Sequence, residues 1–194
     1  MQTITIDQYA IQEIVEFRSE SRLVEKIDFF GRRLVQWQDA DCDSVPHRTH
    51  DQPAEVFFDF ARMWKRDGKL HRDNDRPAII YAEDTSMWYR YGKQHRDGDE
   101  PAAMHANGHR AWYRDGKRHR DGDKPAIIYA DGTNAWFRDG KQHRDGDEPA
   151  VVRDDGSREW WVNGKMHRDD DKPAVVLADG SREWWLNGIK IKTA

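Results

Sequence analysis

A period of 24 residues governs most of this chain and limits what it can fold into. Each copy of the pattern begins with a histidine, and the sixth copy ends at Lys190. Counted from that histidine, every copy has Arg at position 2, Asp at 5, Pro-Ala at 7 and 8, Trp at 18 and Gly at 22. Such self-similarity indicates a tandem array. The six repeats start at His47, His71, His95, His119, His143 and His167.

Each repeat is typical of one β-hairpin followed by a connector. Positions 8 to 12 are short, apolar and often β-branched, and positions 16 to 20 centre on aromatics, which favours two strands. The Asp-Gly at positions 13 and 14, such as Asp131-Gly132, predicts a two-residue turn in which both residues have positive φ. One hairpin cannot bury its own face, so neighbours must stack. We expect a mainly β fold, an elongated ribbon or solenoid of six 24-residue β-hairpin units.

The length of that turn decides which side chains share a face of the sheet. A two-residue loop pairs position 10 with position 17, and a loop longer by one residue exchanges the faces. For repeat four, the shorter loop predicts a buried face of Ala126, Ile128, Ala135 and Phe137. The opposite face then holds Ile127, Tyr129, Asn134, Trp136 and Arg138.

Residues 1–46 lie outside the period and are predicted to cap the array. Thr5-Ile6-Asp7-Gln8 fits a capping box, and apolar residues at Ile11, Ile14 and Val15 predict a short α-helix to about residue 20. Residues 24–30 and 34–37 flank Gly31-Arg32 and predict a degenerate hairpin, followed by a loop over 39–45. The expected organisation is therefore a cap over 1–46, the array over 47–190 and a tail over 191–194.

Composition excludes several classes of protein. No apolar run approaches the roughly 20 residues of a membrane helix, and the first residues lack the basic-then-apolar pattern of a secretory signal. The single cysteine, Cys42, rules out an internal disulfide framework and a Cys-based zinc cluster. Residues 1–46 carry a net charge of −4, and residues 47–194 sum to zero. A reducing cytoplasm is the expected compartment.

The unit PAxxxADGxxxWxxxGKxHR, as in residues 125–144, resembles the MORN-type β-hairpin repeat. It is most similar to the tandem "HRxDxPA" repeats of bacteriophage and large DNA virus proteins. The resemblance covers residues 47–190 and implies a scaffold fold whose partners vary. The pattern has Asp-x-Pro-Ala where MORN repeats have a Gly-x-Gly entry to the strand, so fold transfers better than function.

The repeated His-Arg and Asp of the connectors suggest metal ligands or acid–base pairs at first sight. An enzyme needs one constellation in one pocket, whereas these residues recur in every copy. We therefore expect them to close the connector: in repeat five, Asp147 accepts loop N–H groups, Arg144 pairs with Asp147, and His143 packs on a tryptophan. The Asp-Gly-Asp loops, such as Asp97-Gly98-Asp99, favour plain turns over calcium sites, which need about 6 to 8 ligands.

The tryptophans and nearby arginines form the candidate binding surface. Alternating aromatic and cationic groups stack bases or bind an oligoanion; the alternative is a cation–π ladder that covers the sheet. Irregular positions such as Arg153, Asp154, Glu159 and Glu183 mark either a partner footprint or sequence drift. The candidate residues are Trp88, Trp112, Trp136, Trp160, Arg90, Arg114, Arg138, His105 and His109.

These features favour a non-catalytic repeat scaffold that binds a macromolecular partner. The viral resemblance implies that the partner is a host protein. In its most concrete form, it implies that this chain is a phage-encoded inhibitor of a host enzyme, toxin or defence protein and acts in the host cytoplasm. A nucleic-acid or oligoanion binder and a virion or assembly component are the alternatives. No catalytic residue, cofactor, metal or membrane is expected, and the sequence leaves the oligomeric state open.

Overall fold

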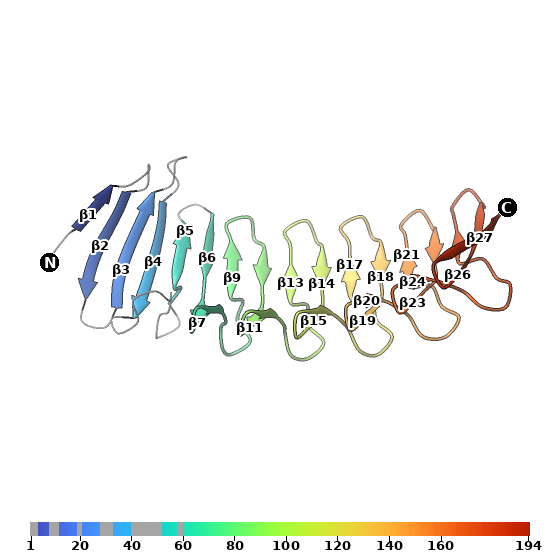
Figure 1. The fold of residues 1–194 in the computed structure, drawn as a ribbon, viewed down its shortest axis with the longest axis horizontal. Coiled ribbons are helices and arrows are strands. Elements are labelled where there is room, and N and C mark those ends of the chain that lie inside the picture. The colour runs from blue at the N-terminus through green and yellow to red at the C-terminus, as the bar shows by residue number, and fades with distance from the viewer. Residues whose placement is uncertain (1–3, 8–11, 19–20, 28–32, 40–51, 58–59) are drawn as a thin grey trace. The chain divides into compact units, whose positions relative to one another are not determined.

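The computed structural model describes residues 4–7, 12–18, 21–27, 33–39, 52–57 and 60–194. These residues form β-strands joined by turns, with no helix among them (Figure 1). The mainly β fold predicted from the repeat is thus confirmed. The chain divides into two compact units, an N-terminal unit (Met1–Lys93) and a C-terminal unit (Gln94–Ala194).

In the N-terminal unit the strands pair antiparallel in chain order, with a short hairpin of β7 and β8 beside them. The paired strands are β1 (Ile4–Asp7), β2 (Gln12–Arg18), β3 (Ser21–Ile27), β4 (Arg33–Asp39), β5 (Glu55–Phe57), β6 (Ala61–Met63), β9 (Ile79–Tyr81) and β10 (Ser86–Met87). The remaining strands are β7 (Lys65–Arg66), β8 (Lys69–Leu70), β11 (Tyr89–Arg90) and β12 (Lys93–Gln94), the last at the boundary between the units.

The helix predicted near the N-terminus is wrong where the structure describes it. Residues 4–7 and 12–18 are the paired strands β1 and β2; residues 8–11 and 19–20 lie outside the described part. The β-branched Ile4, Thr5, Ile6, Ile14 and Val15 restrict χ1 and favour extended backbone. The helical spacing of apolar residues was therefore the weaker signal. Where the hairpin was predicted next, β3 pairs with β4, although both strands begin earlier than predicted and the turn at Gly31-Arg32 lies outside the described residues. Of the predicted loop, Asp39 belongs to β4 and the rest lies outside the described residues.

In the C-terminal unit nine strands pair antiparallel in chain order from β13 to β27. They are β13 (Ala103–Met104), β14 (Arg110–Ala111), β17 (Ile127–Ile128), β18 (Asn134–Ala135), β21 (Val151–Val152), β22 (Arg158–Glu159), β25 (Val175–Val176), β26 (Arg182–Leu186) and β27 (Ile189–Thr193). A second row of short hairpins lies beyond the ends of these strands (Figure 1): β15 (Tyr113–Arg114) with β16 (Lys117–Arg118), β19 (Phe137–Arg138) with β20 (Lys141–Gln142), and β23 (Trp161–Val162) with β24 (Lys165–Met166).

A complete repeat therefore builds two hairpins, not the single hairpin we predicted. In repeat four the first hairpin is β17–β18 and the second is β19–β20, with Trp136 at the bend between them. The second turn, Asp139-Gly140, has φ of 50° and 85°, which is the two-residue turn with both residues at positive φ. The turn geometry that we predicted for Asp131-Gly132 is therefore found at Asp139-Gly140.

The first turn is one residue longer than predicted, and this exchanges the faces of the sheet. Tyr129 N donates to Thr133 O, so the loop is Ala130-Asp131-Gly132, and among these three only Gly132 has positive φ, at 89°. A three-residue loop that ends in a left-handed glycine is a common hairpin turn.

With this loop, position 9 pairs with position 17 and position 10 with position 16. Ile127 opposite Ala135 is the buried pair, and Ile128 opposite Asn134 is half-buried. Of the predicted buried face, Ala126 and Ala135 are buried, whereas Ile128 and Phe137 are only half-buried. The predicted partition into faces is wrong because the loop has three residues instead of two.

The buried row of the C-terminal unit crosses eight strands at one level. Its members are directly opposite one another from strand to strand: Ala103, Ala111, Ile127, Ala135, Val151, Glu159, Val175 and Glu183. All but Glu183 are buried. The alanine at position 8 is completely buried in all six repeats, which explains why a larger side chain does not occur there.

Candidate functional site

The position-18 tryptophans anchor the bend of each repeat. Trp64, Trp88, Trp112 and Trp160 are buried, and Trp136 and Trp184 are half-buried. In repeats two to six the indole Nε1–H donates to the carbonyl of Asp at position 5 of the same repeat, at 2.8 to 3.2 Å. A buried indole N–H needs such an acceptor. Four of these indoles, Trp88, Trp112, Trp136 and Trp160, belong to the predicted binding surface.

The arginine at position 2 joins repeats four, five and six each to the repeat before it. Arg168 lies over the ring of Trp160 at 3.8 Å, and its Nε donates to Asp147 Oδ1 at 2.6 Å. Its Nη2 donates to Asp147 Oδ2 at 3.1 Å, and its Nη1 donates to Pro173 O at 3.2 Å. We call the tryptophan and aspartate that receive this guanidinium the arginine socket. Sockets of the same kind hold Arg120 (Trp112 and Asp99) and Arg144 (Trp136 and Asp123).

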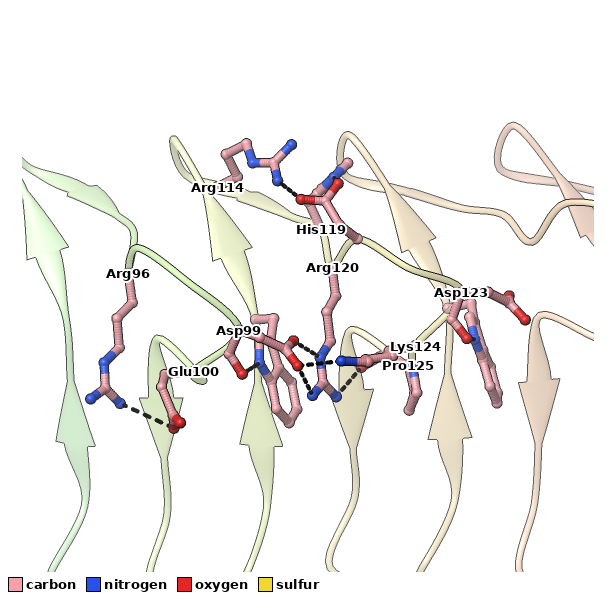
Figure 2. A network of polar contacts seen from close by, with 12 residues as sticks. Arg96, Asp99, Glu100, Arg114, His119, Arg120, Asp123, Lys124 and Pro125 are labelled. Carbon is pink, nitrogen blue, oxygen red and sulfur yellow. Dashed lines mark hydrogen bonds and ion pairs between the residues drawn. The ribbon is translucent and has the colours of Figure 1, made fainter.

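Figure 2 shows the first of these sockets. The guanidinium of Arg120 lies between Asp99 of the preceding repeat and Pro125 of its own, and Lys124 Nζ reaches Asp99 Oδ2 at 2.6 Å. Arg120, followed by Lys124, holds the pKa of Asp99 far below its usual range. Arg168 and Lys172 act in the same way on the pKa of Asp147, and Arg144 on that of Asp123. These carboxylates are therefore ionised partners of fixed cations.

The arrangement of the connector differs from our expectation in its partners. Arg144 pairs with Asp123 of the preceding repeat, at 2.7 and 2.8 Å, and not with Asp147 of its own. Its pKa is raised by the hydrogen bond to Asp123. Because the spacing of 21 residues places the partner in another repeat, the contact joins neighbouring repeats as well as closing a loop.

The histidine at position 1 closes the connector through both ring nitrogens. His143 Nε2 bonds Asp145 Oδ1 at 3.0 Å, and His143 Nδ1 accepts from the backbone N–H of Asn163 at 3.2 Å. Since Nδ1 is an acceptor, the ring is the neutral tautomer with its hydrogen on Nε2. Burial, followed by the charge of Arg138, lowers the pKa of His143 and favours that neutral form. The same two contacts, of Nε2 with the position-3 aspartate and of Nδ1 with a backbone N–H, recur at His71, His95, His119 and His167.

The arginines of the predicted binding surface lie on the second row of hairpins. Arg114 and Arg138 each pair with the position-3 aspartate of the next repeat, Asp121 and Asp145. Those carboxylates also hold the histidines of the connectors. Arg90 lies exposed in β11. In the C-terminal unit, therefore, the predicted arginines Arg114 and Arg138 contact the connectors, whereas the predicted indoles are covered by the position-2 arginines.

His105 and His109, the irregular histidines of repeat three, come together at the tip of the β13–β14 hairpin. Their ring centroids lie 5.0 Å apart at 74°, and His105 N donates to His109 O at 2.9 Å. The ring of His109 also meets Tyr129 of the next repeat at 5.2 Å. Burial, followed by the proximity of His105, lowers the pKa of His109. The structure thus assembles these rings into an aromatic cluster.

A hollow of about 400 Å³ lies between the connectors of repeats three and four. Its walls carry acidic and basic side chains in equal number: Asp97, Asp99, Glu100 and Asp121 against Arg96, Arg114, Arg120 and Lys124. His105 and His109 do not line it. A smaller hollow of about 160 Å³ repeats the arrangement between repeats four and five. These hollows are spaces between connectors whose charges are largely paired across the walls.

The acidic loops send their two carboxylates to different partners. Asp121 bonds His119 and Arg114, whereas Asp123 bonds Arg144. The carboxylates of one loop therefore do not converge on a common point. Within the described residues, no group of three or more His, Cys, Asp or Glu side chains is placed to hold a metal ion.

The residues that sequence reasoning missed are the arginines at position 16. Arg110, Arg158 and Arg182 are exposed on the face of the sheet opposite the buried row. Only the true register of the first turn places position 16 beside position 10 and separates it from the buried positions. The signal available in the sequence was the Gly at position 14, which also suits a three-residue loop.

Comparison with protein-family models, curated protein sequences and solved structures gives no match. The resemblance to MORN-type and viral repeats therefore stays a prediction from the repeat pattern. In the part of the chain that the structure describes, there is no helix of the length and hydrophobicity needed to cross a membrane. The class defined by the structure is an array of double-hairpin repeats joined by arginine sockets.

The last arginine socket is filled by a lysine of the C-terminal tail. Lys192 follows the sixth repeat at the place where a seventh would have its arginine. Its Nζ lies 4.5 Å from the centre of the Trp184 ring and 3.2 Å from Asp171 Oδ1. The tail therefore imitates the first residues of a further repeat and closes the end of the array.

This imitation predicts the effect of changing Lys192. Lys192→Arg restores the planar fork that the socket accepts elsewhere, so we expect the free energy of unfolding to rise by about 0.5 kcal/mol. Lys192→Glu places a carboxylate against Asp171 and should lower it by about 1 kcal/mol. Urea titration followed by circular dichroism measures both. Equal stability of the two variants would contradict the socket assignment, and Lys165→Glu, an exposed lysine outside a socket, is the control.

Proposed function

We propose that this protein is a non-catalytic repeat scaffold, an elongated solenoid-like ribbon, that binds a macromolecular partner. The observation that carries the proposal is the use of the repeated polar residues. The His, Asp and Arg of the connectors bond one another within and between repeats of the C-terminal unit. Groups engaged in this way build the array, so binding falls to exposed positions that differ from repeat to repeat.

A non-catalytic role is supported by the state of the candidate acid–base residues. A general base must reach a substrate proton, and a histidine with both nitrogens bonded inside the protein has no free atom for that purpose. His119 and His143 are both held in this way. The candidate carboxylates Asp99 and Asp147 are likewise ion-paired with two cations each.

A protein is the partner class that the exposed surface supports best. Single-stranded nucleic acid binds by stacking on aromatic faces, but the rings of Trp112, Trp136 and Trp160 are covered by Arg120, Arg144 and Arg168. Nucleic acid or another oligoanion stays the second candidate, favoured by the exposed arginines at position 16. A virion or assembly component is the third.

The most concrete form of the proposal is a phage-encoded inhibitor of a host enzyme, toxin or defence protein, acting in the host cytoplasm. Its support is the resemblance of the repeat to the viral "HRxDxPA" pattern. The extended array of a repeat protein suits this role because it offers a long, rigid surface.

The test is capture of partners from a bacterial lysate by the full chain, with and without nuclease. We expect a protein that is retained after nuclease treatment and that then binds the purified chain with a defined stoichiometry. A salt titration of the purified complex distinguishes the candidates, since the affinity for nucleic acid falls steeply and linearly with log salt. Binding that disappears with nuclease would overturn the protein-binding proposal, and turnover of a small molecule by the chain would overturn the non-catalytic one.

A further inference from the structure

One face of the C-terminal sheet carries a continuous row in which apolar residues alternate with arginine or asparagine. The residues directly opposite one another across eight strands are Met104, Arg110, Ile128, Asn134, Val152, Arg158, Val176 and Arg182. We call this set the outward row. In repeats three to six, position 10 supplies an aliphatic residue each time, and position 16 supplies Arg in three repeats and Asn in one.

The outward row differs from the buried row in exposure and in charge. Its arginines are exposed and its aliphatic residues are half-buried, whereas the buried row is almost completely covered. Arg110, Arg158 and Arg182 make no ion pair with the described residues. By contrast, Arg114, Arg120 and Arg144 of the same unit each hold a carboxylate. The outward row is therefore a strip of apolar surface with three uncompensated positive charges.

We propose that the outward row is the docking surface of the scaffold and that it receives an acidic amphipathic helix of the partner protein. The inference rests on the proposed function and specifies its partner. Arginine is enriched at protein interfaces, where apolar surface is buried beside it, and carboxylates are the complementary charge.

The spacing of the row matches a helix laid across the strands. Neighbouring strands lie about 4.8 Å apart, so Arg158 and Arg182, two strands apart, are separated by roughly 10 Å. Acidic residues one heptad apart on a helix are separated by about 10.5 Å, and apolar residues one turn apart by about 5.4 Å. From Arg110 to Arg182 the row spans about 29 Å, the length of a helix of about 20 residues. Asn134 stands where the fourth arginine would be.

The experiment uses a designed helical peptide of about 21 residues with Glu at every seventh position and Leu one turn away. Its affinity for the full chain is measured by fluorescence anisotropy. Poly-glutamate of equal length and a thymidine oligonucleotide are the comparison probes. We expect the amphipathic peptide to bind at least tenfold more tightly than either probe, because it alone offers both carboxylates and apolar contacts.

The variant R110N/R158N/R182N tests the surface itself. Asparagine already occupies this position in repeat four, so the substitution suits the fold, and an unchanged melting curve verifies it. We expect the peptide's Kd to rise 10- to 100-fold. The matched control is K117N/K141N/K165N, which removes the same charge from exposed lysines of the second hairpin row and should change Kd by less than threefold.

The results distinguish failure of the outward row as a docking surface from failure of the protein-binding scaffold. Peptide binding no tighter than poly-glutamate, or an unchanged Kd in the arginine variant, overturns the docking surface. Tighter, arginine-dependent binding of the oligonucleotide overturns it in favour of nucleic acid. A captured partner protein that binds the arginine variant as well as the wild type would overturn the outward row while the scaffold function stands.

Discussion

Replacing Trp160 with alanine is expected to lower the free energy of unfolding by about 3 to 5 kcal/mol, the range for truncating a buried tryptophan. Trp160 is 7% exposed, its indole bonds Asp147 O at 3.2 Å, and Arg168 lies on its ring at 3.8 Å. The substitution opens a cavity, leaves Asp147 O without its donor and removes the platform for Arg168. Because that arginine joins repeats five and six, the loss is felt on both sides of the contact. Urea unfolding followed by circular dichroism measures it.

Two control substitutions separate the contributions at this position. Trp160→Phe keeps an aromatic ring beneath Arg168 but removes the indole N–H, so a loss of about 1 to 2 kcal/mol is expected. Val162→Ala, two residues along at an exposed position, should cost less than about 0.5 kcal/mol. If Trp160→Ala were no more costly than Val162→Ala, the tryptophans would be surface residues and available for stacking a ligand.

The repeat period was sufficient to predict the first hairpin of each repeat, because the 24-residue pattern repeats the apolar character of its strands and its turn. It did not predict the second hairpin, such as β19 with β20. It was insufficient to predict the register. Asp131-Gly132 suits a two-residue turn and equally a three-residue loop that begins at Ala130, and the choice moves Ile127 from the exposed to the buried face. Periodicity alone does not distinguish these loops, since both fit within the same repeat.

Partners that lie in different repeats were harder to predict than those within one. Every repeat contains Asp and Arg at fixed positions. From the sequence alone, Arg144 could therefore pair equally well with Asp123 of the preceding repeat or with Asp147 of its own. The stacking of repeats decides for Asp123. The same ambiguity concealed the role of Lys192, whose place in the last socket becomes visible only when the tail is aligned with the start of a repeat.

The predicted site named the residue types that meet in the structure, tryptophan and arginine, but not the positions of the arginines within the repeat. The predicted ladder combined the tryptophans with the arginines two residues after them, such as Trp136 and Arg138. The arginine that lies on the ring of Trp160 is instead Arg168, at position 2 of the next repeat, where it stabilises the array. Arg110, Arg158 and Arg182, which make no ion pair with the described residues, are at position 16, which the predicted register had placed beside position 11. The length of the first loop therefore determines that position 16 lies on the exposed face of the sheet, beside position 10.

Deleting residues 1–40 is expected to convert the protein from a discrete species into aggregates. Strand β4 covers the edge of the first repeat by pairing with β5, with Leu34 opposite Phe57, Val35 opposite Val56 and Gln36 opposite Glu55. An uncovered strand edge is a template for pairing with other chains. The deletion also removes the buried Val35, which leaves apolar surface exposed at the same edge. Size-exclusion chromatography with light scattering measures the outcome.

The charge at this edge adds to the expected effect. Glu55 is 5% exposed, accepts from Gln36 Nε2 at 2.8 Å and pairs with Lys65 at 2.6 Å. Without β4 the carboxylate loses the amide donor of Gln36, which is costly for a buried charge. Deletion of residues 1–20 is the matched control, because it also uncovers a strand edge, that of β3, but keeps β4 with Val35 and Gln36 on β5. We expect that variant to aggregate much less than the 1–40 deletion. A 1–40 deletion that elutes as the wild type does, with an unchanged unfolding midpoint, would show that the array folds without its N-terminal strands.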